Sequence, residues 1–247
     1  MTAAFAATVT GRAIDFAAPI VEPAHLFSEI AHGLSFIARF AGQTPTAYSV
    51  AQHSVLMAEA AEDETGEPAL AAYCLLHHGH TAYLGDTPWQ TALAIEAELI
   101  RAAAEKGVPD MIVDSQIARW RALRRRVEAR LDAAIHRAAG LEAIDDRGRA
   151  IVQIYDVRAL TTERRDLFLG GDGAPASGLP LKGGAENSPW PDLSDAPALP
   201  LRQGRIRTWP PGVAAERFVL ALTRLCPDAA LAAGRLDDDE AEERRLA

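Results

Sequence analysis

Apolar residues recur at helical spacing along most of the chain. The segment after Pro23 shows this spacing from His25 to Leu34, and we expect its helix to continue toward Ile37 and Phe40. The same periodicity predicts further helices over residues 50–61, 69–80, 90–106, 114–139, 147–168 and 213–225. The predicted fold class is therefore all-α, a helical bundle.

Two of these helices have clear start signals. Ser49 stands just before residues 50–61 and is followed three positions later by Gln52, a capping-box pattern that satisfies free backbone N–H groups. Pro68 suits the first turn of the helix over residues 69–80. That helix is apolar on nearly every side before its histidines, which predicts that it is buried.

Three regions lack the helical pattern. Residues 8–17 form two short extended pieces around Gly11 and predict a small N-terminal β-hairpin. Residues 170–212 are rich in Gly and Pro, and we expect a functional flap or a packed irregular arm there. The tail from Asp237 onward is acidic and is expected to fray.

The length of 247 residues suffices for one well-buried core with appendages. Hydrophobic residues make up 49% and charged residues 24%, which is typical of a globular protein. We expect a helical domain over residues 1–168. Residues 169–247 then form the irregular arm, a terminal helix packed on the same domain, and the acidic tail.

Composition also limits the partners and the compartment. The net charge of −9 argues against a long nucleic acid as partner. No basic stretch precedes a long apolar core, and no apolar run approaches the ~20 residues that span a bilayer, so we expect a cytoplasmic protein without a membrane partner. The two cysteines, Cys74 and Cys226, indicate neither a disulfide framework nor a cysteine zinc site.

Four potential metal ligands fall on three of the predicted helices. His53 follows the capping box, His77 and His78 end the apolar helix, and Asp156 lies within residues 147–168. A carboxylate on a mostly apolar stripe is costly unless it is paired or bound to a metal. Imidazole and carboxylate together suit Mn, Fe, Co, Ni or Zn. The residues that share the helix face of Asp156 are Val152, Ala159 and Glu163.

Each of these residues also has a purely structural interpretation. His53 could be a helix histidine whose hydrogen bonds are satisfied in the core. His32 and His80 could simply be partly exposed. Asp156 could form an ion pair with Arg39, Arg158 or Arg164. Spacing alone does not select the metal over these alternatives.

Five sequence blocks in a fixed order resemble a known family. They are GRAID at residues 11–15, IAHGLSFIARFAGQT at 30–44, YSVAQHSVL at 48–56, LLHHGHTAYLGDTP at 75–88 and DVRALTTERRDL at 156–167. In these blocks the chain resembles the HD-domain phosphohydrolase superfamily, and more narrowly its bacterial 5′-deoxynucleotidase group. The resemblance spans roughly residues 8–168 and, more weakly, residues 209–225.

The resemblance implies an HD-domain helical bundle that binds one divalent transition metal. Its metal ligands would be His53, His77, His78 and Asp156. Arg39, beside Phe40, would contact the substrate phosphate, and Asp86 would lie near the sugar and the attacked phosphate. The implied activity is hydrolysis of a nucleotide, a deoxynucleotide or a similar small phosphate ester. Relatives of this kind are often dimers, so a homodimer is expected as a possible state.

Two functional positions depart from the family pattern. His78 replaces the aspartate that gives the family its name, so a neutral imidazole stands where an anionic oxygen ligand is expected. Thr81 replaces the glutamate that transfers a proton in the nucleotidase group, and threonine cannot do this at neutral pH. Asp86 or His80 would then have to take over the proton transfer.

Three interpretations of function follow from these departures. The first is an active metal-dependent phosphohydrolase. The second is a catalytically degenerate HD-domain protein that binds a nucleotide or a protein partner without hydrolysis. The third is redirected metal chemistry of the di-iron oxygenase type, favoured by the clustering of His77, His78 and His80 with His32. The loss of the usual bridging aspartate at position 78 argues against it.

Overall fold

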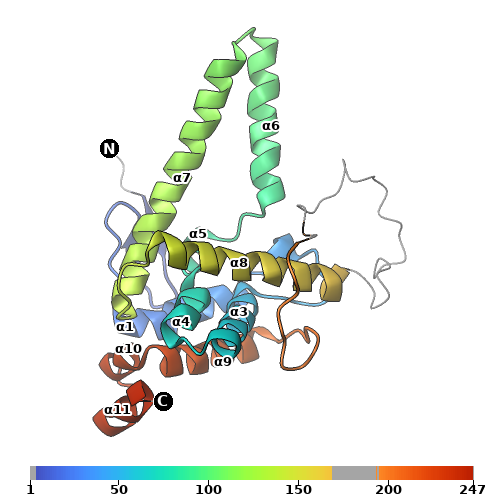
Figure 1. The fold of residues 1–247 in the computed structure, drawn as a ribbon. Coiled ribbons are helices and arrows are strands. Elements are labelled where there is room, and N and C mark those ends of the chain that lie inside the picture. Colours follow the sequence, from blue (N-terminus) through green and yellow to red (C-terminus); the bar gives the residue numbers. More distant parts are fainter. Residues whose placement is uncertain (1–3, 169–192, 194, 247) are drawn as a thin grey trace.

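The computed structural model describes residues 4–168, 193 and 195–246. They form a mostly helical body with one small antiparallel sheet, as the all-α prediction requires (Figure 1). The strands are β1 (Phe5–Ala7) and β2 (Ala13–Asp15). The helices and helical turns are α1 (Pro23–His25), η1 (Leu26–Ile30), α2 (Ala31–Phe36), η2 (Arg39–Gly42), α3 (Val50–Thr65), α4 (Pro68–Leu76), α5 (Thr81–Leu84), α6 (Trp89–Glu105), α7 (Asp110–Ala138), α8 (Asp146–Glu163), η3 (Arg164–Phe168), α9 (Pro211–Leu225), α10 (Pro227–Ala232) and α11 (Asp238–Leu246).

Helices α3 and α4 pack against each other at the centre of the body. Helix α8 crosses them on one side, and α9 covers them and α2 on the other (Figure 1). The prediction that the helix before His77 is buried is confirmed, because Leu70, Cys74, Leu75 and Leu76 of α4 all lie in the core. The core thus holds α3, α4 and α8 in fixed relation, and these three elements bear or adjoin the candidate ligands.

The N-terminus of α3 forms as the capping pattern predicts. The backbone N–H of Gln52 donates to Ser49 Oγ at 3.2 Å. The Gln52 side chain does not complete a capping box. Instead its Nε2 donates to the carbonyl of Arg207 at 2.8 Å, and its Oε1 accepts from the N–H of Trp209 at 2.9 Å. Gln52 therefore ties the later irregular segment to the start of α3.

The helix predicted to reach Phe40 ends earlier, at Phe36. The backbone after Phe36 adopts an extended conformation, and Ala38 pairs with Ser49 in an antiparallel bridge. Phe40 and Ala41 then adopt left-handed φ angles of 56° and 52°, which non-glycine residues rarely take. The prediction that the helix continues to Phe40 was wrong, because pairing with the segment before α3 overrides the local apolar spacing.

The hairpin prediction is confirmed, with strands displaced from the expected residues. Phe5 pairs with Asp15, and residues 8–12 form the connecting turn, in which Gly11 has a φ of +85°. The expected fraying of the acidic tail was wrong, because Asp238–Leu246 form α11. Acidic residues in the first turn and arginines in the last favour this helix through its dipole.

The described part of the expected irregular arm packs on the body, whereas residues 170–192 and 194 of that prediction lie outside the described residues. Leu199 is buried, and its N–H donates to Thr162 Oγ1 at 2.8 Å. Arg202 forms a bidentate ion pair with Asp63 of α3. These contacts make residues 195–210 a packed irregular segment.

Helices α6 and α7 leave the body together as a long antiparallel pair joined at its far tip (Figure 1). Their ribbons lie close at the tip and diverge toward the body. We call this pair, formed by Trp89–Glu105 and residues 110–130, the arm; it is distinct from the irregular segment predicted for residues 170–212. Within the described part of the chain, no helix has the length and apolar character needed to cross a bilayer.

Candidate metal centre

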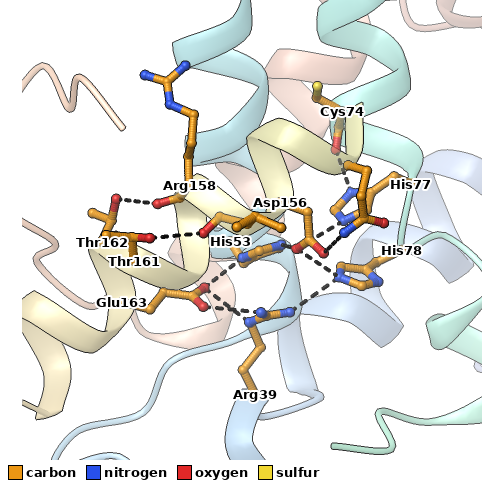
Figure 2. A network of polar contacts seen from close by, with 12 residues as sticks. Arg39, His53, Cys74, His77, His78, Asp156, Arg158, Thr161, Thr162 and Glu163 are labelled. Carbon is orange, nitrogen blue, oxygen red and sulfur yellow. Dashed lines mark hydrogen bonds and ion pairs between the residues drawn. The ribbon is translucent and has the colours of Figure 1, made fainter. Parts of the chain in front are cut away.

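Four side chains from three places in the chain converge on one point between α3, α4 and α8. His53, His77, His78 and Asp156 each offer one ligand atom, and these atoms lie within 4.8 Å of one another. Asp156 Oδ1 is 3.3 Å from His53 Nε2, 3.7 Å from His77 Nε2 and 3.9 Å from His78 Nε2. The structure therefore brings together all four ligands predicted from the sequence (Figure 2).

Neighbouring groups orient two of the imidazole rings. His53 Nδ1 lies 2.6 Å from Glu163 Oε1, and His77 Nδ1 lies 2.9 Å from the carbonyl of Cys74. Because each Nδ1 faces an acceptor, Nδ1 bears the proton in the neutral form of each ring, which leaves the lone pair on Nε2. Both Nε2 atoms therefore point their lone pairs at the gap in front of Asp156.

The donor set fits a transition metal. The Nε2 atoms of His53 and His77 are buried and have no hydrogen bond within the described residues. A buried polar atom without a partner is costly, and a metal ion would satisfy both at once. Three imidazoles and one carboxylate form a mixed N and O set that suits Zn, Fe, Co, Ni or Mn.

The charge states of two ligands also suit a metal. Burial opposes ionisation of Asp156, but the neighbouring imidazoles of His53 and His77 hold the pKa of this carboxyl well below its usual value. Burial, with the charge of His77, lowers the pKa of His78 well below that of a free histidine. An anionic Asp156 and a neutral His78 are the forms that bind metal.

Arg39 lies at the edge of the cluster, held from both its backbone and its side chain. Its N–H donates to the carbonyl of Tyr48 at 2.9 Å. Its Nε and Nη2 lie 3.1 Å from the two oxygens of Glu163, and its Nη1 lies 3.3 Å from His78 Nε2 (Figure 2). The guanidinium is thus anchored on Glu163 along one edge, and its Nη1 faces the ligand cluster.

Phe40 packs beside this guanidinium. The Arg39 guanidinium carbon lies 5.3 Å from the centre of the Phe40 ring, and that ring meets Phe168 edge to face at 5.0 Å. The left-handed backbone of Phe40 and Ala41 begins directly after Arg39. Strain of this kind persists only where surrounding contacts enforce it, and here those contacts position Arg39.

The His80 side chain lies outside the ligand cluster and points toward α7. Its Nδ1 lies 2.8 Å from Asp132 Oδ1, and its ring centre is 6.2 Å from that of His78. Burial opposes protonation of His80, but the hydrogen bond to Asp132 raises its pKa overall. Gly79 allows the tight turn before it, since a Cβ there would lie 3.0 Å from the Leu76 carbonyl and from Ile135 Cδ1.

Asp86 lies within electrostatic reach of the centre, on the segment between α5 and α6. Burial raises the pKa of its carboxyl, against the lowering influence of Arg39 and His53. Thr81 is buried at 4% exposure. His32 is exposed on α2 beside Phe36 and is not a member of the ligand cluster.

Two ion-pair alternatives for Asp156 do not form. Arg158 instead makes a bidentate ion pair with Glu64, and Arg39 pairs with Glu163. The polar contacts of Asp156 are chiefly to the three histidines. The carboxylate on the apolar stripe is therefore committed to the candidate metal centre.

The sequence did not identify two supporting carboxylates. Glu163 is fully buried, accepts a hydrogen bond from Tyr48 at 2.8 Å, and contacts both His53 and Arg39. Its place two turns after Asp156 on the same helix face was a usable signal, because a buried carboxylate needs partners. Asp132 gave no such signal, since its partner His80 lies 52 residues away.

Comparison with known proteins gives similarity without an activity. No protein-family model matches the chain. It is 29% identical over 199 residues to the uncharacterized protein YfdR of Escherichia coli K12. The alignment covers 78% of this chain and 82% of that protein. It is 34% identical over 152 residues to an uncharacterized protein of Rhodobacter capsulatus. That alignment covers 58% of this chain and 62% of the relative's length.

Proposed function

We propose that the protein is a metal-dependent phosphohydrolase of the HD-domain type, acting on a nucleotide, a deoxynucleotide or a similar small phosphate ester. The observation that supports this best is the convergence of His53, His77, His78 and Asp156 around one point with Arg39 at its edge. A cation site next to a fixed guanidinium is suited to hold and polarise a phosphoryl group. A divalent metal would supply the Lewis acidity for this polarisation.

The charges of the site explain why a metal would be needed even to bind phosphate. Asp156 and Glu163 have lowered pKa values despite burial and are anionic at neutral pH. Arg39 is the cation that faces them, and Glu163 already neutralises it. A phosphate dianion would be repelled by this arrangement. A bound divalent cation would reverse the balance, so substrate binding should depend on metal.

Arg39 would orient the phosphate in this proposal. Glu163 holds Nε and Nη2, which leaves Nη1 facing the cluster as a donor at fixed direction. A guanidinium positioned in advance loses little side-chain entropy when it binds an anion. Asp156 and two of the histidines are partly accessible, with side-chain exposures of 26%, 14% and 24% for Asp156, His77 and His78, so a small ligand can reach them.

Proton transfer in place of the missing glutamate would fall to Asp86 or His80. Asp86 has a carboxyl whose pKa is raised by burial, which brings it closer to neutral pH. His80 is held by Asp132 in a carboxylate–histidine pair, which fixes its tautomer and leaves Nε2 free to accept or donate. Both stand next to the centre on the segment from residue 80 to residue 86.

Two observations favour the alternative of a degenerate HD-domain protein that binds a nucleotide or a protein partner without hydrolysis. Because a threonine hydroxyl does not ionise near neutral pH, Thr81 provides no ionisable group at the position of the lost glutamate. In addition, Arg39 Nη1 lies 3.3 Å from the same His78 nitrogen that would bind a metal. A weak or absent metal with intact ligand binding would agree with this alternative.

The decisive experiment is calorimetric titration of chelator-stripped protein with Mn, Fe(II), Co, Ni and Zn, followed by a screen for phosphate release from nucleotides. We expect about one metal per chain, loss of binding in Asp156→Ala, and loss of both binding and phosphate release in His53→Ala. Turnover that is unchanged in His53→Ala would refute the proposed hydrolase.

The matched controls are surface residues of the same types. Asp146→Ala at the exposed start of α8 and His32→Ala on α2 should leave metal binding and turnover unchanged. Metal binding without turnover on any phosphate ester, together with nucleotide-induced thermal stabilisation, would favour the degenerate binding protein. Iron retention with consumption of O₂ would instead favour redirected metal chemistry.

A further inference from the structure

The arm exposes large apolar side chains along both of its helices. Trp89, Leu93 and Ile100 on α6 are 41%, 44% and 52% exposed, and Trp120 and Leu123 on α7 are 40% and 47% exposed. Trp89, Leu93, Glu96, Ile100 and Ala103 follow each other at alternating spacings of four and three. This spacing puts them on one stripe of α6, the pattern of a helix that packs in a bundle.

The two helices of the arm cover only part of this stripe for each other. Ala103, Val113 and Ile117 form a small buried cluster near the tip, with Val108 packed against it. Nearer the body the ribbons diverge (Figure 1). Glu96 of α6 and Arg121 of α7 form an ion pair between the two helices. An antiparallel helix pair with an open apolar face is poorly stable alone in water. In the part of the arm nearer the body, the apolar side chains of α6 and α7 are therefore left exposed.

Exposed apolar side chains are concentrated on the arm. Nine large apolar side chains of the arm are each more than a third exposed, the others being Ile95, Leu99, Met111 and Ile112. Exposed apolar side chains gathered on one element that protrudes from the body indicate a site of protein–protein contact.

We propose that the arm is covered by the arm of a second copy of this chain, so that two helix pairs form an intermolecular four-helix bundle. A helix hairpin is self-complementary, because a two-fold axis places α6 of one copy against α7 of the other. The charges match this arrangement. Helix α6 has three glutamates and one arginine, whereas residues 110–130 of α7 have six arginines and three acidic residues.

The arm is continuous with the candidate metal centre at both of its ends. Asp86 lies just before α6, and Asp132, which holds His80, lies just after the arm on α7. Dimerisation through the arm would therefore brace both segments from which proton transfer is proposed. The dimer itself does not depend on the proposed activity.

The test is the mass of the full-length chain in sedimentation velocity from micromolar to near-millimolar concentration. We expect twice the chain mass of 26.4 kDa for the unaltered protein and a shift to one chain mass in Leu93→Glu/Leu123→Glu. Leu220→Glu is the matched control, because this leucine of α9 is 62% exposed and lies outside the arm, and it should stay dimeric.

Two results would overturn the proposal. An unaltered chain that stays monomeric throughout would mean that a different protein covers the arm, and a dimer that persists in Leu93→Glu/Leu123→Glu would mean another interface. If the double variant loses its helical circular dichroism, amide exchange of the unaltered chain decides. Protection of α6 and α7 must then fall on dilution into the monomer, and unchanged protection would refute the arm interface.

Discussion

Glu163 Oε1 lies 2.6 Å from His53 Nδ1, on the far side of the imidazole from Asp156. The carboxylate thus fixes the tautomer of the most deeply buried ligand and aims its Nε2 at the centre. The same carboxylate anchors Arg39. One buried residue therefore sets the geometry of both the candidate metal centre and the Arg39 guanidinium.

The first prediction concerns this supporting carboxylate. Glu163→Gln should weaken metal binding by roughly 10–100-fold without removing any ligand, because the amide cannot stabilise the His53 tautomer to the same degree. Calorimetric titration of stripped protein measures the change. Glu98→Gln on the exposed side of α6 is the control and should bind as the unaltered chain does. Equal affinity in the Glu163 variant would contradict the assigned role.

The local parts of the fold were predictable from short-range sequence patterns, whereas the ligand set was predictable from the family resemblance. Ser49 caps α3 as its spacing indicates. The family resemblance predicts His53, His77, His78 and Asp156 as one ligand set, and the structure brings these four side chains together. The cap depends on residues a few positions apart. The ligands lie on distant segments, and the packing of α3, α4 and α8 brings them together.

The parts that failed depend on distant contacts. The turn after Phe36 forms because Ala38 pairs with Ser49, which overrides an apolar spacing that would otherwise favour a helix. Asp132 reaches His80 only because Ile135 packs α7 on the turn at Gly79. No local pattern contains either contact.

The second prediction tests the His80–Asp132 pair as a positioning device. Asp132→Asn should lower kcat about tenfold with little change in KM and no loss of metal affinity, since the amide holds the His80 ring without its charge. Phosphate release and metal titration on the same preparation separate the effects. Asp114→Asn, on an exposed part of α7, should leave both unchanged. A parallel loss of metal affinity would assign Asp132 to the metal site instead.

The third prediction concerns stability in acid. Glu29 is buried, and although burial opposes its ionisation, hydrogen bonds from Arg12 and Thr10 lower its pKa to about 2. Since this folded-state pKa is below the ordinary value of 4.5, the ionised form stabilises the fold above about pH 4.5. That contribution is lost as the pH falls through 4.5 toward 2.

Glu29→Gln should therefore lower the free energy of unfolding by about 1–3 kcal/mol at neutral pH, because Arg12 loses its charged partner. The loss of stability between pH 5 and 2 should also become shallower. Urea melts at several pH values measure both. Glu105→Gln, in an exposed pair with Arg101, is the control and should change the neutral value by less than about 0.5 kcal/mol. An unchanged acid slope in Glu29→Gln would contradict the assigned pKa.

The fourth prediction uses the strained turn beside Arg39. Ala41 is exposed and has a φ of 52°, a conformation that glycine adopts without steric cost. Ala41→Gly should raise the free energy of unfolding by up to about 1 kcal/mol, since relief of left-handed strain outweighs the extra chain entropy. Ala38→Gly is the control on the same segment. Its φ of −76° is ordinary, so only the entropy cost remains and stability should fall. Thermal melts of both variants measure these opposite signs, and a fall in both would mean that the turn at Ala41 stores no strain.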